Sequence, residues 1–265
     1  MKKIKHVAIV GSGIIGISTA IWLLRAGHQV ILIDKSNQQQ RASYGNGGVL
    51  ASCSFVPVNS PGLLRKAPRM LIDPDEPLFL KWTYLPKMVP WLWQYLGRAN
   101  AKNCTQTAAA IQPLVADSLN NHLAMAQGTG AEQFIIPSDY LYVYKNRKHF
   151  ESDAFGWSLR AEHGVQWAEL DGADFFTYQD CFAETLTFAA KMTNHGRISD
   201  PGAYLQALEQ HVLNAGGTKI IGCFEDVEYQ NNEVQAVIVD GQRTPCDAAV
   251  LATGAWSKKL AAKFG

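Results

Sequence analysis

Residues Lys5 to Lys35 read KHVAIVGSGIIGISTAIWLLRAGHQVILIDK and leave few options for the fold of the first part of the chain. A short apolar run leads into closely spaced glycines, then into an apolar helical pattern and a second apolar run that ends at Asp34. The glycines are Gly11, Gly13 and Gly16. This order predicts one complete unit of strand, turn, helix and strand.

Each of these glycines has a separate physical task in holding a dinucleotide. Gly11 permits a tight turn, Gly13 lets the backbone approach a pyrophosphate, and Gly16 lets the helix lie close to the sheet. The first helical residues, Ile14 and Ile15, then present backbone amides to the anion. The turn therefore predicts a pyrophosphate site.

Asp34 ends the second apolar run, about 20 residues beyond the glycines, where a carboxylate can accept both hydroxyls of an adenosine ribose. We include the adjacent Lys35 among the candidate contacts. A carboxylate at this place would repel a 2′-phosphate. The spacing therefore favours FAD or NAD over NADP.

Two simpler interpretations compete with a nucleotide site. The basic start and apolar middle could be a signal peptide, but glycines would weaken its helix, no small-residue cleavage site follows, and Gly27-His28 leads directly into another strand. The second interpretation is that the glycine pattern matches by chance. The complete unit, with the acid in register, favours the nucleotide site over both.

Composition predicts a globular protein and excludes several classes of function. The 24 basic and 23 acidic side chains give a net charge of +1, so no nucleic-acid partner is expected. The five cysteines are widely spaced and never form a Cys-x-x-Cys pair, which predicts reduced, buried thiols in a cytoplasmic protein and no metal site.

A second glycine-rich stretch, ASYGNGGVLA, follows a polar segment, Lys35 to Arg41, that is predicted to be a surface loop. Its glycines allow close backbone approach to a ligand, and its short polar side chains offer hydrogen bonds. Taken alone, an ordinary turn explains the stretch equally well. The candidate cofactor contacts here are Ser43, Asn46, Gly47 and Gly48.

The opening unit and this second loop together resemble the FAD-dependent D-amino acid oxidase superfamily, above all its bacterial D-amino acid dehydrogenase and glycine oxidase branches. The resemblance implies that Ser43, Asn46 and Gly48 lie near the phosphates and the flavin ring. The family usually has Glu where this chain has Asp34. This departure is conservative and keeps the ribose contact.

The late segment LATGAW, which contains Thr253 and Gly254, resembles the strand end that closes over FAD in such flavoproteins and favours flavin over nicotinamide. Val227 matches the family position whose backbone meets the adenine. An NAD-dependent dehydrogenase is the weakest of the alternatives, because LATGAW and the second glycine loop argue against it.

The predicted fold class is α/β, a Rossmann-like FAD-binding domain with an inserted α+β substrate domain. Residues 1–80 and 194–265 are expected to form the FAD-binding domain and 81–193 part of the substrate domain. Periodicity, turn signals and caps predict individual elements. These are helices over 105–127, broken near Pro113, over 147–163, and from Pro201 behind the cap Asp200; strands over 139–145, 185–192 and 218–221; and an antiparallel meander over 227–251.

Residues Leu78 to Leu96 are crowded with Trp and Tyr. These aromatic side chains are expected to fill a seam between domains. A peripheral contact with the inner face of a membrane, or with a quinone, is the alternative, because Trp and Tyr favour wet apolar boundaries.

His195 stands at the predicted junction between the domains and is the only catalytic candidate we single out. A loop hydrogen bond is the favoured explanation for it, and the catalytic residues are otherwise unknown.

In the family that this chain resembles, a small amino acid, here a D-amino acid, loses a hydride from its CH–NH2 or CH–NHR carbon to flavin N5, and a quinone or oxygen takes the electrons. The resemblance implies amino acid catabolism with FAD as cofactor. The family's carboxylate-binding residues normally lie in a longer C-terminal portion that this sequence does not contain. A dinucleotide-binding remnant without turnover is therefore the alternative function.

Overall fold

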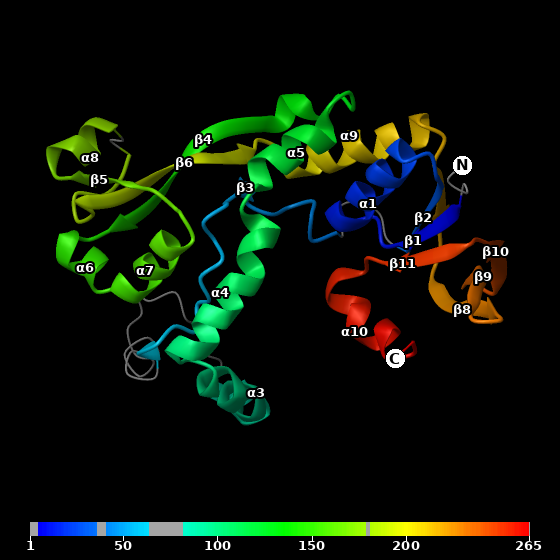
Figure 1. Ribbon diagram of the computed structural model, residues 1–265, viewed down its shortest axis with the longest axis horizontal. Helices are drawn as coiled ribbons and strands as arrows, with labels where there is room; N and C mark the ends of the chain where they lie inside the picture. Colours follow the sequence, from blue (N-terminus) through cyan, green and yellow to red (C-terminus); the bar gives the residue numbers. More distant parts are fainter. Residues whose placement is uncertain (1–4, 36–40, 64–81, 179–180, 265) are drawn as a thin grey trace. The chain divides into compact units, whose positions relative to one another are not determined.

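The computed structural model describes residues 5–35, 41–63, 82–178 and 181–264. They form two compact units (Figure 1). The first contains the described residues of Met1–Val49, Asn120–Ile136 and Arg197–Gly265, and the second those of Leu50–Leu119 and Pro137–Gly196. Both the 50–63 segment and the 120–136 segment are thus grouped differently from the predicted domain ranges. The division into an FAD-binding domain and a substrate domain stays a prediction.

The first unit is built on a four-stranded sheet in the order β11-β1-β2-β7, in which every neighbouring pair is parallel. Its strands are β1 (His6–Val10), β2 (Gln29–Asp34), β7 (Thr218–Ile221) and β11 (Ala248–Leu251). β1 is the inner strand between β2 and β11, and its residues from Val7 to Val10 are buried, as expected of a strand covered on both faces. The predicted α/β fold with a parallel sheet is confirmed.

Helix α1 (Ile14–Arg25) connects β1 to β2, and glycine controls the turn before it. Gly11 adopts a φ of +102°, and its N–H donates to the carbonyl of Ile33 over 2.7 Å. A β-carbon at Gly16 would overlap the carbonyl oxygen of Gly11. Both positions therefore need glycine for the reasons that the spacing predicts.

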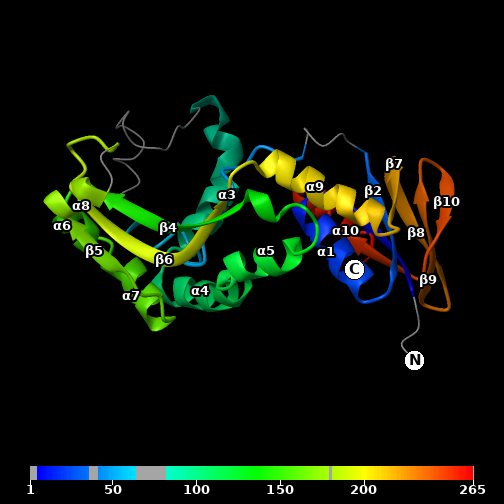
Figure 2. The ribbon, with the colours of Figure 1, turned by 90° about the horizontal axis from the view of Figure 1, so that it is seen from above.

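Helix α9 (Pro201–Asn214) packs beside α1, as both views show (Figure 1, Figure 2). Its start is as predicted: Pro201 occupies the first turn, and the Asp200 side chain accepts from the Ala203 N–H over 2.9 Å.

The 120–136 segment, with most of α5 (Ser118–Ala126) and with η3 (Glu132–Phe134), is tied to the same unit. The Arg25 guanidinium donates to the carbonyls of Ala124, Met125 and Gln127. His122 Nδ1 lies 2.8 Å from the Tyr204 hydroxyl, and burial lowers the pKa of His122 and raises that of Tyr204. These contacts explain why a segment from the middle of the chain belongs to the first unit.

An antiparallel meander of β8 (Phe224–Gln230), β9 (Glu233–Val239) and β10 (Gln242–Pro245) completes the first unit, as predicted. Each hairpin turns on two successive residues with positive φ, Asn231-Asn232 and Asp240-Gly241. The side chains of Phe224, Val237 and Val239 pack with Val10 and Ile33 in one buried cluster. The chain ends in η4 (Gly254–Trp256) and α10 (Ser257–Ala261).

The second unit contains most of a sheet in the order β3-β6-β4, with β5 also paired to β6. An aromatic cluster that includes Tyr144, Phe150, Trp157 and Phe188 fills its core. The strands are β3 (Val49–Leu50), β4 (Ile135–Tyr144), β5 (Ala168–Asp171) and β6 (Phe188–Ile198). The helices are η2 (Trp82–Tyr84), α3 (Leu85–Gly97), α4 (Ala101–Val115), α6 (Arg147–Glu151), α7 (Ala154–Glu162) and α8 (Ala173–Tyr178).

Several boundaries in the middle of the chain differ from the prediction. β6 continues through His195 to Ile198, whereas the sequence predicts a strand that ends at Met192. The helix expected over 147–163 is two helices, α6 and α7, with Ser152 and Asp153 between them. The helix expected over 105–127 begins earlier, at Ala101, and restarts at Ser118 after Pro113, as a proline near a helix end allows.

Among the described residues no helix is long and apolar enough to cross a membrane. The prediction of uniformly buried thiols is wrong: Cys53, Cys104 and Cys246 are buried, but Cys181 and Cys223 are exposed.

Candidate functional site

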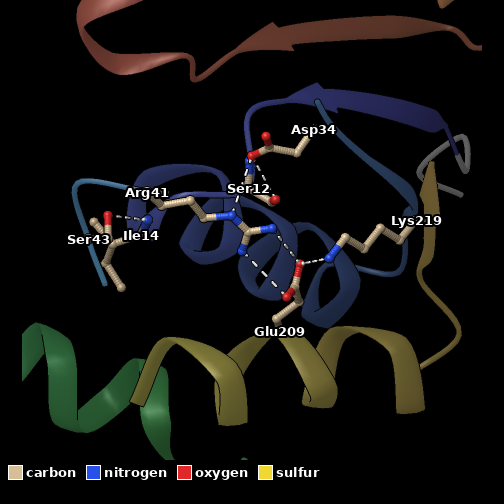
Figure 3. A network of polar contacts seen from close by, with 7 residues as sticks. All are labelled: Ser12, Ile14, Asp34, Arg41, Ser43, Glu209 and Lys219. Carbon is tan, nitrogen blue, oxygen red and sulfur yellow. Dashed lines mark hydrogen bonds and ion pairs between the residues drawn. The ribbon is translucent and has the colours of Figure 1, made fainter. Parts of the chain in front are cut away.

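The start of α1 and the second glycine loop meet in the first unit. Gly13 precedes the helix with an extended backbone, and no side chain of the turn itself caps the helix. Instead the Ile14 N–H donates to the Ser43 hydroxyl over 3.0 Å (Figure 3). The structure thus brings together two segments that the sequence places in one cofactor site.

The surroundings of Gly13 fit a pyrophosphate. Among the described residues other than its chain neighbours, only the Ser43 hydroxyl would lie within 4 Å of a β-carbon at Gly13, at 3.3 Å, so the backbone there is open to a ligand. The first turn of α1 carries no acidic residue, so nothing in that turn opposes the partial positive charge of the helix start. Backbone amides and an open approach are what an anion needs at this place.

Asp34 lies at the carboxyl end of β2, beside the same turn. Its Oδ2 atom accepts from both the N–H and the hydroxyl of Ser12, over 2.8 and 2.9 Å (Figure 3). The carboxylate is therefore held in one orientation at the edge of the glycine turn, as a ribose contact requires.

The second glycine loop is shaped by its own hydrogen bonds. Asn46 accepts from the Gly48 N–H over 2.8 Å, and Gly48 has a φ of +65°. A β-carbon at Gly48 would overlap the carbonyl oxygen of Ile198. Gly47 and Asn46 are exposed, whereas Gly48 is buried. Gly48 is thus needed for backbone packing, whatever it contacts in a ligand.

The end of β11 also reaches the glycine turn. A β-carbon at Gly11 would lie 2.5 Å from the carbonyl oxygen of Ala252 and 3.1 Å from the Thr253 nitrogen. Thr253 and Gly254 thus follow directly from the segment that contacts Gly11. Lys35 Nζ lies 5.7 Å from the centre of the Trp256 ring. The glycine turn, the end of β2 with Lys35, and the segment that follows β11 are therefore neighbours.

The other candidate contacts are placed as follows. Val227 lies on β8 and packs against the cluster that contains Val10 and Ile33, and its N–H donates to the Asp226 side chain over 2.9 Å. Ile15 is exposed on the first turn of α1. Their contacts with a cofactor stay predictions.

His195 is buried in the second unit, and both of its ring nitrogens have partners there. Nδ1 donates to the Thr193 carbonyl over 2.7 Å, and Nε2 accepts from the Cys53 N–H over 3.3 Å. This pattern assigns the neutral ring with its proton on Nδ1. Burial raises the pKa of the Cys53 thiol, so this neighbour stays protonated. With both ring nitrogens engaged inside the unit, a catalytic role for His195 stays a prediction.

Sequence reasoning missed a set of charged residues behind Asp34. Arg41, predicted to end a surface loop, has a side chain only 4% exposed. It forms ion pairs with Asp34 and with Glu209 of α9, and Glu209 also contacts Lys219 of β7 (Figure 3). Arg41 and Glu209 are 168 positions apart, so no local pattern could reveal the pair. No group of three metal-ligating side chains occurs in the described part of the chain.

Comparison with known proteins gives the site a context. The model of a family described as FAD dependent oxidoreductase matches residues 6–265. A D-amino-acid oxidase of Bradyrhizobium diazoefficiens is 37% identical over 265 residues, which cover 98% of this chain and 62% of that protein. A D-amino acid dehydrogenase of Helicobacter pylori is 24% identical, over 95% of this chain and 60% of that protein. The chain thus spans about three fifths of these relatives.

Solved structures show the same fold at low sequence identity. A glycine oxidase from Bacillus cereus has a TM-score of 0.64 at 21% identity, over 98% of this chain and 58% of that structure. An L-amino acid deaminase from Proteus vulgaris has a TM-score of 0.68 at 15% identity, over 100% of this chain and 57% of that structure.

Proposed function

The chain belongs to the family of FAD-dependent oxidoreductases, and from this premise we propose that it serves the oxidation of a small amino acid. FAD is the cofactor of this family. We propose that the group oxidised is the CH–NH2 or CH–NHR group of a D-amino acid, and that the reaction belongs to amino acid catabolism. The relative of 37% identity, named a D-amino-acid oxidase, supports this substrate class.

One observation carries the proposal most directly. The Ser43 hydroxyl from the second glycine loop accepts a hydrogen bond from the first backbone N–H of α1, that of Ile14. It lies next to the open backbone of Gly13. Gly13, Ile14 and Ser43 would hold the pyrophosphate, and Asp34 would accept the ribose hydroxyls. When bound, FAD supplies the hydride acceptor. The contribution of this chain's own residues is to bind and orient the ADP half of the cofactor.

An absorption spectrum tests the proposal. The chain, incubated with FAD and freed of unbound flavin, is expected to show the visible bands of oxidised flavin. Anaerobic addition of D-alanine, D-proline or glycine is expected to bleach them, while L-alanine serves as the control. A colourless protein contradicts the proposed cofactor site. A yellow chain that no amino acid bleaches supports the alternative, a dinucleotide-binding remnant without turnover. Recolouring by oxygen or only by a quinone identifies the electron acceptor.

We further propose that the protein is cytoplasmic and that it contacts the inner face of the membrane through α3. This helix has no buried residue, and Trp91 and Trp93 are 56% and 82% exposed. Residues 77–116 contain four Lys or Arg and no Asp or Glu. Exposed tryptophans on a helix that lies in a basic stretch suit an anionic lipid surface.

Vesicle sedimentation tests the membrane contact. The chain is expected to sediment with anionic phospholipid vesicles, less so with neutral ones, and the double variant Trp91→Ala, Trp93→Ala is expected to stay in the supernatant. Trp22→Ala, which removes an exposed tryptophan from α1, is the matched control. No binding to anionic vesicles favours the other interpretation, in which the aromatic side chains fill a seam between protein domains.

A further inference from the structure

A row of alternating charges extends from the ribose-contact residue into the first unit. Arg41 Nε lies 3.6 Å from Asp34 Oδ2, and the two terminal nitrogens of Arg41 donate to the two oxygens of Glu209 over 3.4 and 3.3 Å (Figure 3). Lys219 Nζ lies 2.7 Å from Glu209 Oε1. The order is therefore Asp34, Arg41, Glu209 and Lys219, with the sign of charge changing at each step.

The first three members of the row are shielded from solvent, so water and salt screen their charges less than those of a surface pair. The exposed fractions of the side chains are 12% for Asp34, 4% for Arg41 and 3% for Glu209. Its members come from four places: the end of β2, the residue before the second glycine loop, α9 and β7. A buried arginine in this position needs an acidic partner, and Glu209 supplies one without using Asp34.

An arginine beside the ribose-binding carboxylate has two opposite uses in dinucleotide folds. It can bind a ribose 2′-phosphate, or its charge can attract and hold a carboxylate that binds a free 2′-hydroxyl. Here both terminal nitrogens of Arg41 are engaged by Glu209 as a fork. Only the Nε side faces Asp34, and Nε–H forms no hydrogen bond within the described part of the chain.

We infer that Arg41 is a positioning residue for Asp34, and that Glu209 with Lys219 keeps it in that role, so that the site selects a ribose with a free 2′-hydroxyl. The inference rests on the proposed ADP site. In the ADP site, the positive charge at Nε adds to the Ser12 contacts in orienting the Asp34 carboxylate, while Glu209 keeps the arginine fork away from the ligand. Selection against a 2′-phosphate thus comes from Glu209 as well as from Asp34.

Titration calorimetry with ADP and 2′-deoxy-ADP separates positioning from mere structural support. For the wild-type chain, loss of the 2′-hydroxyl is expected to weaken binding by about tenfold or more, the worth of a hydrogen bond to a charged group. In Arg41→Met the ratio of the two affinities is expected to fall to about threefold or less, because Ser12 then orients Asp34 without the opposing charge of Arg41. Arg41→Lys keeps the charge without the fork and is expected to give a ratio between those of the wild-type chain and Arg41→Met.

The matched control is Arg243→Met. Arg243 also forms a fork with a glutamate of the same unit, Glu228, but that pair is exposed on the meander. Arg243→Met is expected to leave the affinities for ADP and for 2′-deoxy-ADP unchanged. If Arg41→Met weakens ADP and 2′-deoxy-ADP by the same factor, Arg41 is only structural and the inference is wrong. If the wild-type chain binds neither ligand, the proposed cofactor site itself fails.

Glu209→Gln tests the second half of the inference. This change weakens the hold on the Arg41 fork and is expected to raise the affinity for 2′-phospho-ADP relative to ADP by about tenfold, the worth of one charge-assisted contact. An unchanged preference for ADP in Glu209→Gln would show that Asp34 alone selects the ribose.

Discussion

Gly13→Val is expected to abolish flavin binding while the first unit stays folded. The valine side chain would occupy the open space in front of the helix start, where the Ser43 hydroxyl lies 3.3 Å from the added carbon. A pyrophosphate could then no longer reach the amides of α1. Loss of two such charge-assisted hydrogen bonds corresponds to about 3 kcal/mol, a fall in affinity of about a hundredfold or more.

The fold of the variant is expected to survive because Gly13 has a φ of −72° and a ψ of −176°, an extended conformation that any residue adopts. Flavin fluorescence quenching measures the affinity, and circular dichroism measures the fold. Gly97→Val is the matched control, since Gly97 is exposed at the end of α3 and, outside its own helix, no described residue comes within 4 Å of an added β-carbon. Flavin binding retained by Gly13→Val would refute the placement of the site.

The parts of this fold that the sequence predicts well are those set by neighbouring residues. The glycine turn needs Gly11 at positive φ, and α9 begins at Pro201 behind its cap Asp200. The meander turns at Asn231-Asn232 because both residues tolerate the left-handed conformation. Each of these features is decided within a few residues, so a pattern in one stretch of sequence is enough.

The features that escaped prediction are set by partners far away in the sequence. Arg41 follows a run of glutamines and has the sequence context of a surface loop, yet Glu209 on a distant helix buries it. β6 continues through a polar stretch, Thr193 to His195, in a sheet where it pairs with β4, and His195 finds partners there at Thr193 and Cys53. Tertiary pairing overrides local polarity in both places.

The same contrast between local and long-range determinants explains which parts of the candidate site the sequence could predict. The proposed pyrophosphate cradle depends on one turn, so Gly13 and Ile14 could be proposed from spacing alone. The contact between Ile14 and Ser43 joins two stretches, and only the resemblance to a known family suggested it before the structure placed them 3.0 Å apart. The support of Asp34 by Arg41, Glu209 and Lys219 had no signal of either kind.

Gly16→Ala is expected to destabilise the first unit strongly, although it adds a single methyl group to a helix. The added carbon would overlap the Gly11 carbonyl oxygen and lie 3.3 Å from the Ile9 side chain, and neither the backbone of a tight turn nor a fully buried strand can yield. Overpacking of this kind costs about 3 kcal/mol, which corresponds to a fall of about 1 M in the urea midpoint. Alanine otherwise favours helices over glycine by about 1 kcal/mol, so the expected loss runs against helix propensity. Gly97→Ala, free of any clash, should show no such fall, and an unchanged midpoint in Gly16→Ala would mean that α1 does not lie as close to β1 as the glycine spacing requires.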